Sequence, residues 1–160
     1  MCYAYGIQTM AADPVDLTLE LAPRARFDVV ELRSRFAAEH REALAPYGSC
    51  LYWSAHTTAG FLDRSLIARL SPEGVPTYIE AFRSMFPENA GYEHDRLERR
   101  EELDAAQRAI EPRNADSHLA FIAGGLHACV THPNRADEAV CFVDLDGVYE
   151  GRPRRRRMRV

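Results

Sequence analysis

A stretch of strictly alternating residues places the strongest constraint on the fold. Residues 15–21 carry apolar side chains at odd positions and polar ones at even positions, with a proline near either end. A period of two is typical of a half-buried β-strand, and the prolines punctuate it. Residues 2–9 and 49–55 are short aromatic runs that also predict strands. Residues 11–14 are expected to turn the chain between the first two strands.

Helical periodicity appears after these first strands. Apolar side chains recur at helical spacing over residues 29–44. Asp28 is placed as the N-cap of this helix, and Glu31 stands at the capping-box position. Pro46 and Gly48 follow as the stop signal. The sequence therefore predicts one long helix between the alternating strand and the strand at residues 49–55.

The second half of the chain mixes both kinds of element. Further helices are predicted at residues 61–70, 77–86 and 115–123, and further strands at residues 126–131 and 139–145. Asn114 is the expected N-cap of the last helix, and Asp146-Gly147 is a turn signal. Because strands and helices do not alternate as βαβ units, we expect one α+β domain over residues 1–160.

Charge is spread unevenly along the sequence. The formal net charge is −4, but six arginines lie within residues 152–160, which leaves 14 basic against 24 acidic side chains elsewhere. Residues 97–110 are dense in Arg and Glu, so we expect a charged insertion, either a solvated helix or a mobile segment. Residues 152–160 form either a last strand or a disordered basic tail. No basic face covers the domain and no aromatic residues interleave with these arginines, so nucleic-acid binding is not expected.

The cysteines and the apolar runs bear on location. The four cysteines form no CxxC pair, which is typical of free thiols in a reducing compartment. The first ten residues have neither the basic region nor the apolar core of a secretory signal, and no apolar run approaches 18 residues. We therefore expect a cytoplasmic protein without a membrane span.

Three histidines stand out as candidate metal ligands. His56 follows the strand at residues 49–55, His94 lies in a loop, and His118 lies one helical turn beyond Asn114. Three imidazoles suit Zn²⁺ and leave one position open to water or substrate. The alternative is that each is structural, because spacings of 38 and 24 residues form no local motif.

The other histidines are expected to have no chemical role. His40 is placed at the edge of the buried stripe of its predicted helix, although it could face a site. His127 and His132 flank the predicted strand at residues 126–131, and both are expected to face solvent.

Three ordered motifs make the chain resemble a known family. HTTA occurs at residues 56–59, YEHD at residues 92–95 and NADSHL at residues 114–119. In this order they resemble the HTTA, Y-x-H and N-A-D-A-H-L segments of YjbQ-type proteins. Asp146-Gly147, followed by RPRRR at residues 152–156, is similar to the closing D-G-P-R-x-R strand of that family with four residues inserted.

The resemblance implies a compact YjbQ-like α+β domain with largely antiparallel sheets, usually assembled as a homotrimer. It also implies a site near subunit contacts where histidines gather around a metal ion. Members are often described as secondary thiamine-phosphate synthases, transferases that join a pyrimidine diphosphate to a thiazole phosphate with loss of pyrophosphate. A metal-dependent hydrolase is the other enzyme class that we consider. In both cases the expected partner is a small anionic, phosphorylated metabolite.

These motifs assign expected roles to individual residues. The expected ligands of a divalent ion, Zn²⁺, are His56, His94 and His118, and the expected catalytic residues are His56, His118 and Asp95. Hydroxyl, amide and guanidinium groups near these histidines can hold an anion. On that ground the expected substrate-binding residues are Thr57, Thr58, Asn114, Arg113, Arg154 and Arg156.

Two departures from the family pattern leave other functions open. Arg64 and Ser65 stand where the family usually has an Asn-Glu pair, and residues 135–138 replace its G-T-W-Q segment. A non-catalytic protein that binds an anionic metabolite is therefore one alternative. A trimeric interaction protein whose arginine-rich C-terminus contacts RNA or acidic partners is another.

Overall fold

The computed structural model describes residues 13–160, so the strand predicted at residues 2–9 lies outside the described residues. The strands are β1 (Thr18–Leu21), β2 (Asp28–Glu31), β3 (Ser49–Ser54), β4 (Ala59–Phe61), β5 (Cys129–Pro133), β6 (Cys141–Asp144), β7 (Val148–Tyr149), β8 (Arg152–Pro153) and β9 (Arg156–Arg159). The helices are α1 (Leu32–Leu44), α2 (Arg64–Met85), α3 (Ala105–Ile110) and α4 (Ala115–Ala123), with 3-10 turns η1 (Glu93–Asp95) and η2 (Leu97–Arg99).

The strands form two sheets and one hairpin. The four-stranded sheet has the order β1-β9-β3-β5, the three-stranded sheet has the order β2-β6-β4, and β7 pairs with β8. Every pairing among these strands is antiparallel. The predicted α+β class with antiparallel sheets is therefore confirmed.

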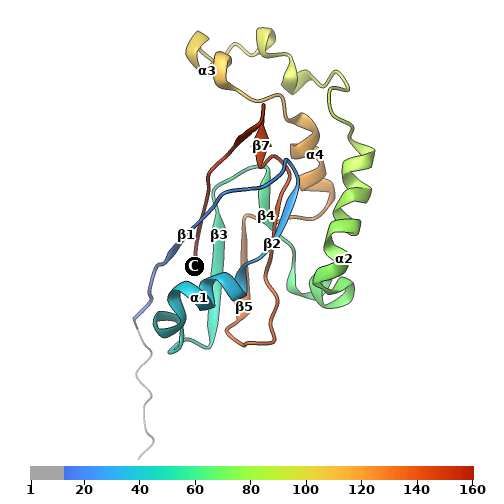
Figure 1. Cartoon of the computed structure of the whole chain (residues 1–160). Coiled ribbons are helices and arrows are strands. Elements are labelled where there is room, and N and C mark those ends of the chain that lie inside the picture. The colour runs from blue at the N-terminus through green and yellow to red at the C-terminus, as the bar shows by residue number, and fades with distance from the viewer. Residues whose placement is uncertain (1–12) are drawn as a thin grey trace, which may run out of the picture.

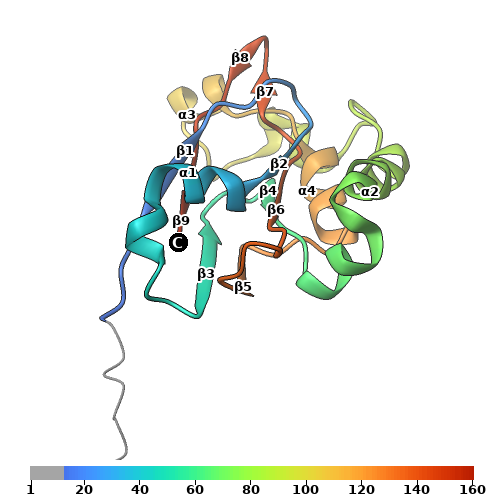
Figure 2. The same ribbon diagram turned by 60° about the horizontal axis from the view of Figure 1, so that its bottom comes forward.

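The three-stranded sheet lies in the middle of the molecule (Figures 1 and 2), where β4 and β6 are buried on both faces and β2 is partly buried. Alternation along β6 shows this directly, because Phe142 belongs to one core cluster while Cys141 and Val143 belong to the other. The first cluster fills the space toward α1 and the four-stranded sheet. The second cluster fills the space toward α2 and α4. Burial on both faces explains why residues 139–143, which lead into and form most of β6, are a continuous apolar run in the sequence.

Aromatic side chains join α1 to the sheets. The Phe36 ring lies edge-on to Tyr52 of β3 at a centroid distance of 5.7 Å. Phe61 of β4 lies 6.2 Å from Tyr52 and 5.3 Å from Phe142. All four side chains are buried, and each contributes about 1.5–3 kcal/mol through loss of apolar surface from water.

The start of α1 differs from the prediction. Residues 28–31 form β2 and pair with β6, so Asp28 does not cap a helix. The N-cap is Glu31, whose carboxylate accepts hydrogen bonds from the backbone N–H groups of Arg33 and Ser34. Val29 and Val30 explain the difference, because β-branched residues favour strands where a partner strand is available. The partner, β6, is distant in sequence and cannot be inferred locally.

The two helices predicted between residues 61 and 86 are joined in α2, which has a kink. Ser71 has a positive φ of 55° inside α2, at the break that the sequence predicted. The helix begins at Arg64 after an Asp63 cap, because Phe61 belongs to β4 and pairs with Phe142. Strand β4 is too short, at three residues, to have a readable period.

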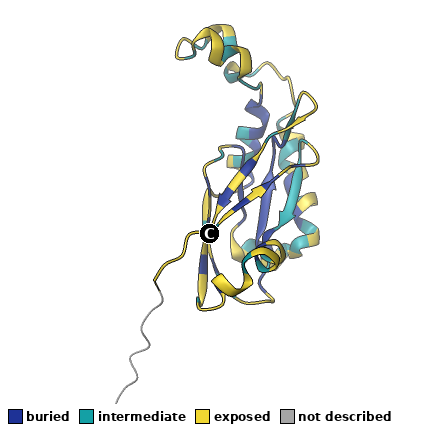
Figure 3. Ribbon diagram, turned by 60° about the vertical axis from the view of Figure 1, so that its left-hand side comes forward, coloured by how far each residue is buried: buried dark blue, intermediate teal, exposed yellow. Residues whose placement is uncertain are grey.

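The charged segment and the arginine-rich end have different structures. Most residues from 97 to 110 are exposed and project from one end of the molecule (Figure 3), and only α3 within them is an α-helix. Residues 152–160 form β8 and β9, so the strand alternative is confirmed and the disordered tail is wrong. No helix within residues 13–160 combines the length and the apolar character needed to cross a membrane.

The predicted environment of His132 is wrong. This histidine lies in β5 and is 1% exposed, whereas His127 is exposed as expected. Its Nδ1 is 3.2 Å from Glu138 Oε1, and its ring meets Tyr52 edge-on at 6.0 Å. β5 begins three residues later than predicted, at Cys129, and His132 then lies opposite Cys50 of β3. Its side chain therefore points into the core rather than into solvent.

Candidate functional site

The YEHD and NADSHL segments meet in space. His94 lies in η1 and His118 in α4, and their ring centroids are 4.9 Å apart with the planes tilted by 53°. Burial lowers the pKa of His118 and the neighbouring His94 lowers it further, while the carboxylates of Asp146 and Glu111 oppose the shift. A lowered pKa keeps His118 neutral near pH 7, so its ring can act as a base or as a metal ligand.

Asp95 connects this histidine pair to the start of α4. Its Oδ1 lies 3.0 Å from His94 Nδ1 and accepts a hydrogen bond from Ala115 N–H at 3.0 Å. The carboxylate therefore satisfies one free amide at the helix N-terminus and orients the His94 ring. Asn114 occupies the predicted N-cap position, but its side chain forms no capping hydrogen bond. A carboxylate from another segment performs that role instead.

The Asn114 side chain bonds to Asp146. Its Nδ2 donates to Asp146 Oδ2 at 2.7 Å, and Arg154 forms an ion pair with the same oxygen. Asp146 is fully buried, and within the described structure its Oδ1 and the Oδ1 of Asn114 have no hydrogen-bond partner. Such an oxygen costs about 1–3 kcal/mol unless a donor or cation satisfies it. Two of them in one bonded pair are typical of a place where a ligand, an ion or water completes the network.

A buried ion pair, Arg156–Asp144, contacts the backbone of Asp146 beside this network. Arg156 Nε and Nη2 donate to the Asp144 carboxylate at 2.7 and 2.8 Å, and Nη2 also donates to the Asp146 carbonyl oxygen at 2.6 Å. Both side chains of the Arg156–Asp144 pair are 2% exposed. Arg156 was expected to bind substrate, but the structure commits its guanidinium to Asp144. It holds the site together rather than facing a ligand.

Sequence reasoning missed the two aspartates as site residues and assigned Asp146 only to a turn. One signal was present, because Asp144 and Asp146 follow a buried apolar run, where carboxylates require partners.

Gly147 has a second role beyond the turn. A Cβ there would lie 2.5 Å from Pro23 Cβ and 2.7 Å from the Ala25 carbonyl oxygen. Only glycine lets these segments approach so closely.

His56 lies next to the arginine-rich strand. Its half-buried ring accepts a hydrogen bond at Nε2 from Arg157 N–H at 3.1 Å. Burial lowers the pKa of His56, and Arg156 and Arg154 lower it further, while Asp144 opposes them. The bond from Arg157 uses the Nε2 lone pair, so only Nδ1 is left for another partner.

The predicted substrate-binding residues occupy different environments. Thr57 and Arg113 are exposed, and Arg154 is partly exposed beside Asp146. Thr58 is buried, and its carbonyl oxygen accepts a hydrogen bond from Leu145 N–H at 3.0 Å. The hydroxyl of Thr57 and the guanidinium groups of Arg113 and Arg154 are therefore the ones accessible to an anion.

The predicted three-histidine metal set is not assembled in the structure as described. Among residues 13–160, no three His, Cys, Asp or Glu side chains form a group that could hold a metal ion. His94 and His118 lie together, whereas the charged neighbours that act on His56 are Arg156, Arg154 and Asp144. The involvement of all three histidines in metal binding stays a prediction.

Comparison with solved structures bears on the family. A hypothetical protein from Aeropyrum pernix K1 superposes with a TM-score of 0.59 at 16% identity, covering 91% of this chain and 96% of that chain. A YbjQ-like protein of unknown function from Sulfolobus solfataricus P2 gives 0.56 at 20% identity, covering 91% and 93%. A yjbq/upf0047 family protein from Clostridium acetobutylicum gives 0.57 at 15% identity, covering 89% and 95%. This chain has the YjbQ-like fold. No family model and no curated protein matches the sequence.

The two departures from the YjbQ-type motifs lie in contact with each other. Arg64 stands in place of the family's Asn-Glu pair, and Glu138 ends the segment that replaces G-T-W-Q. Arg64 Nε donates to Glu138 Oε1 at 2.6 Å. The same Glu138 oxygen faces His132 Nδ1. An ion pair thus joins two segments whose sequence differs from the YjbQ-type pattern, 74 residues apart.

Proposed function

We propose that this YjbQ-like protein is an enzyme that acts on a small phosphorylated metabolite at the His94–His118 pair. The observation that supports this proposal most is the half-buried imidazole pair, in which the pKa of His118 is lowered and the charge of the buried Asp146 carboxylate acts on His118. Groups of this kind, with shifted pKa values and unsatisfied polar atoms, concentrate at functional sites.

In this proposal each side chain has a separate task. In hydrolysis, neutral His118 accepts a proton from the attacking water, since a base with a lowered pKa is unprotonated near pH 7. Asp95 holds the His94 ring through Nδ1 and leaves Nε2 available to a ligand. Arg154 and Arg113 donate to phosphoryl oxygens, and the Thr57 hydroxyl adds a neutral donor. Asp95 is thus a positioning residue, while His118 touches the reacting group.

A divalent ion such as Zn²⁺ is part of the proposal. His94 fits one of its ligand positions through Nε2, because neutral imidazoles are ordinary Zn²⁺ ligands, whereas His118 cannot hold the ion with the one lone pair that it uses as a base. The unpartnered Oδ1 of Asp146 is a carboxylate oxygen in the same network, and His56 fits less well because Arg157 N–H uses its Nε2. A bound metal would polarise a phosphoryl oxygen or lower the pKa of a bound water.

The proposed chemistry is transfer or hydrolysis at a phosphorylated centre. A transferase of the thiamine-phosphate synthase kind would bind a diphosphate and release pyrophosphate. A metal-dependent hydrolase would use the same groups to deliver water. Both need cationic donors for the leaving phosphate, which Arg113 and Arg154 supply in this proposal. Only hydrolysis also needs a base, which is His118, because water must lose a proton whereas the attacking thiazole ring nitrogen carries none. We further propose assembly as a homotrimer, which sedimentation velocity can test.

The test compares His118→Ala with His127→Ala, a matched change of an exposed histidine outside the site. Binding of inorganic pyrophosphate by calorimetry, metal content after Zn²⁺ loading, and turnover of a pyrimidine diphosphate with water and with a thiazole phosphate are measured for each. We expect His118→Ala to lose turnover with water and to keep its metal content, and His127→Ala to retain both; a loss of metal in His118→Ala would make His118 a ligand instead of the base. Full turnover in His118→Ala would contradict the assignment of the base.

A non-catalytic metabolite-binding protein is the second candidate. The Arg64–Glu138 pair favours it, because residues that replace the family's Asn-Glu and G-T-W-Q positions are here tied to each other. Pyrophosphate binding without turnover of any phosphorylated metabolite would support this candidate.

An interaction protein that uses the arginine-rich C-terminus to contact RNA or acidic partners has less support. Four of the six terminal arginines form ion pairs within the chain, namely Arg154, Arg156, Arg157 and Arg159.

A further inference from the structure

A pocket of about 600 Å³ lies between α1 and residues 134–139, and Tyr52 of β3 lines it as well. Its volume falls within the range of small-molecule pockets, about 300–1,000 Å³. We call it the α1 pocket. It shares no residue with the His94–His118 pair, and α1 and α3 lie at opposite ends of the molecule (Figure 1). Any ligand of this pocket is therefore separate from the substrate of the histidine site.

Asn134 fixes the walls of the α1 pocket. Its Nδ2 donates to the carbonyl oxygens of Leu44 and Tyr47 at 2.7 and 2.8 Å. Its Oδ1 accepts a hydrogen bond from Arg33 Nη1. One side chain thus ties the loop at residues 134–139 to both ends of α1. A pocket held in this way is formed before a ligand enters, which reduces the entropy lost on binding.

Three carboxylates line the α1 pocket, and each of them is already engaged. Glu31 accepts hydrogen bonds from two backbone N–H groups as the N-cap of α1. Asp137 pairs with Arg135 at 3.2 Å. Glu138 pairs with Arg64 at 2.6 Å. Neither of these two arginines lines the pocket, so no carboxylate is paired with a cation inside it.

Two arginines of α1 do line the α1 pocket. Arg33 and Arg41 stand four residues before and four residues after Ala37, whose small side chain leaves room between them. In the described part of the chain neither arginine belongs to an ion pair. Burial raises the pKa of Tyr52 to about 12, while the nearby charge of Arg33 opposes the rise. The Tyr52 hydroxyl therefore stays protonated near pH 7 and can donate beside the guanidinium.

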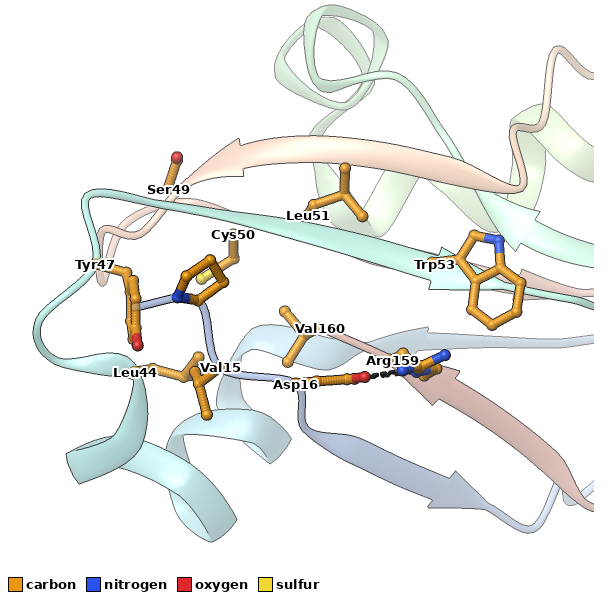
Figure 4. A pocket seen from close by; sticks show the side chains of 11 residues that line it. Val15, Asp16, Leu44, Tyr47, Ser49, Cys50, Leu51, Trp53, Arg159 and Val160 are labelled. Carbon is orange, nitrogen blue, oxygen red and sulfur yellow. Dashed lines mark hydrogen bonds and ion pairs between the residues drawn. The ribbon is translucent and has the colours of Figure 1, made fainter. Parts of the chain in front are cut away.

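A second pocket, between residues 14–16 and β3, shows the contrast (Figure 4). Its volume is about 410 Å³, and the arginine that lines it, Arg159, pairs with Asp16. The same guanidinium lies 5.7 Å from the Trp53 ring centroid. The cation of this second pocket is thus neutralised within the chain, whereas the arginines of the α1 pocket are available to an anion.

We propose that the α1 pocket binds a small organic anion that carries an apolar ring. Its charged group pairs with Arg41 and Arg33, because guanidinium groups match both carboxylate and phosphate oxygens. Its ring packs against the apolar walls, which include Ala37 and Leu44. An anion without a ring would leave these walls in contact with water. A neutral ring would gain nothing from the two guanidinium groups.

Titration of the full chain with four probes, followed by amide NMR signals, tests both halves of this recognition. Benzoate and phenyl phosphate carry a ring and a charge, inorganic phosphate has no ring, and benzyl alcohol has no charge. We expect the first two probes to shift the signals of residues 31–45 and 134–139 saturably. We expect the last two probes to bind about tenfold more weakly. The tighter of the first two identifies the preferred charged group.

Two variants and one matched control locate the site. Arg41→Ala removes an exposed cation of the pocket, and Ala37→Leu fills the room between the arginines without changing the charge. We expect each variant to weaken binding of benzoate and phenyl phosphate about tenfold. The control is Arg35→Ala, an exposed arginine of the same helix that does not line the pocket. We expect this control to leave both affinities unchanged.

Three outcomes would overturn the proposal. Neither ring-bearing anion shifts the pocket signals saturably, benzyl alcohol binds as tightly as benzoate, or Arg41→Ala and Ala37→Leu both bind like the unmodified chain. Pyrophosphate binding is measured on the same samples. Because the α1 pocket and the histidine pair share no residues, we expect pyrophosphate to bind equally in all three variants. Failure of the pocket thus leaves the proposed histidine site intact, and the reverse holds as well.

Discussion

Two imidazole–carboxylate pairs in this protein have similar geometry and different surroundings. His94 Nδ1 lies 3.0 Å from Asp95, and its side chain is 33% exposed. His132 Nδ1 lies 3.2 Å from Glu138, and its side chain is 1% exposed. The first pair stands against a second histidine at the surface, whereas the second is packed against Tyr52 in the core. The comparison shows that accessibility, rather than the pair itself, separates candidate chemistry from structural support.

If burial decides the structural role of a charged pair, breaking the buried Asp144–Arg156 pair should cause the largest loss of stability. Asp144→Ala leaves Arg156 buried without its carboxylate, and we expect a loss of about 3–5 kcal/mol in the free energy of unfolding, measured by urea denaturation. The matched control, Asp16→Ala, breaks the exposed pair with Arg159 and should cost about 0–1 kcal/mol. Equal effects of the two changes would show that burial does not decide the value of these pairs.

His132→Ala comes next in size. It removes a buried ring beside Tyr52 and leaves a cavity, and we expect a loss of about 2–4 kcal/mol in urea denaturation. His132→Phe keeps the ring and should recover more than half of that loss. A cost near zero for His132→Ala would mean that this pair is not structural.

The open pair should respond to pH. Since the pKa of His118 is lowered in the folded protein, the unfolded chain binds more protons once the pH falls below about 6.5. The contribution of His118 to stability is therefore complete above that pH and is lost as the pH falls toward its folded pKa. Unfolding free energies at pH 7.5 and 5.5 should differ less in His118→Gln than in the unmodified chain. An unchanged difference would show that His118 does not titrate in this way.

His94→Ala should have the smallest effect on stability, about 0.5 kcal/mol, because the ring is partly exposed. It should raise the pKa of His118, since His94 is one cause of the lowering. Titration of the His118 ring by NMR measures this shift. A lower pKa of His118 in His94→Ala would show that the two rings do not interact as described.

Local patterns predicted the elements whose cause is local. The alternation before Leu21, the strand at β3 and the helix after Asn114 follow from the period of the side chains. Local sequence patterns gave the wrong structure where a strand distant in sequence determines the pairing. Val29 and Val30 became strand because β6 pairs with them, and His132 became buried because β5 places it opposite Cys50. Intrinsic propensity is too small to resist such pairing.

The sequence by itself determined the α+β class, the order of the three histidine segments and their resemblance to YjbQ-type motifs. Tertiary structure alone decided that His94 meets His118, that Asp95 caps α4, and that His56 bonds to the arginine-rich strand. It also joined Asp146 to Asn114 and Arg154 in the candidate site. The physical reason is that a carboxylate buried far from its sequence neighbours takes its partners from whichever segments the core brings beside it.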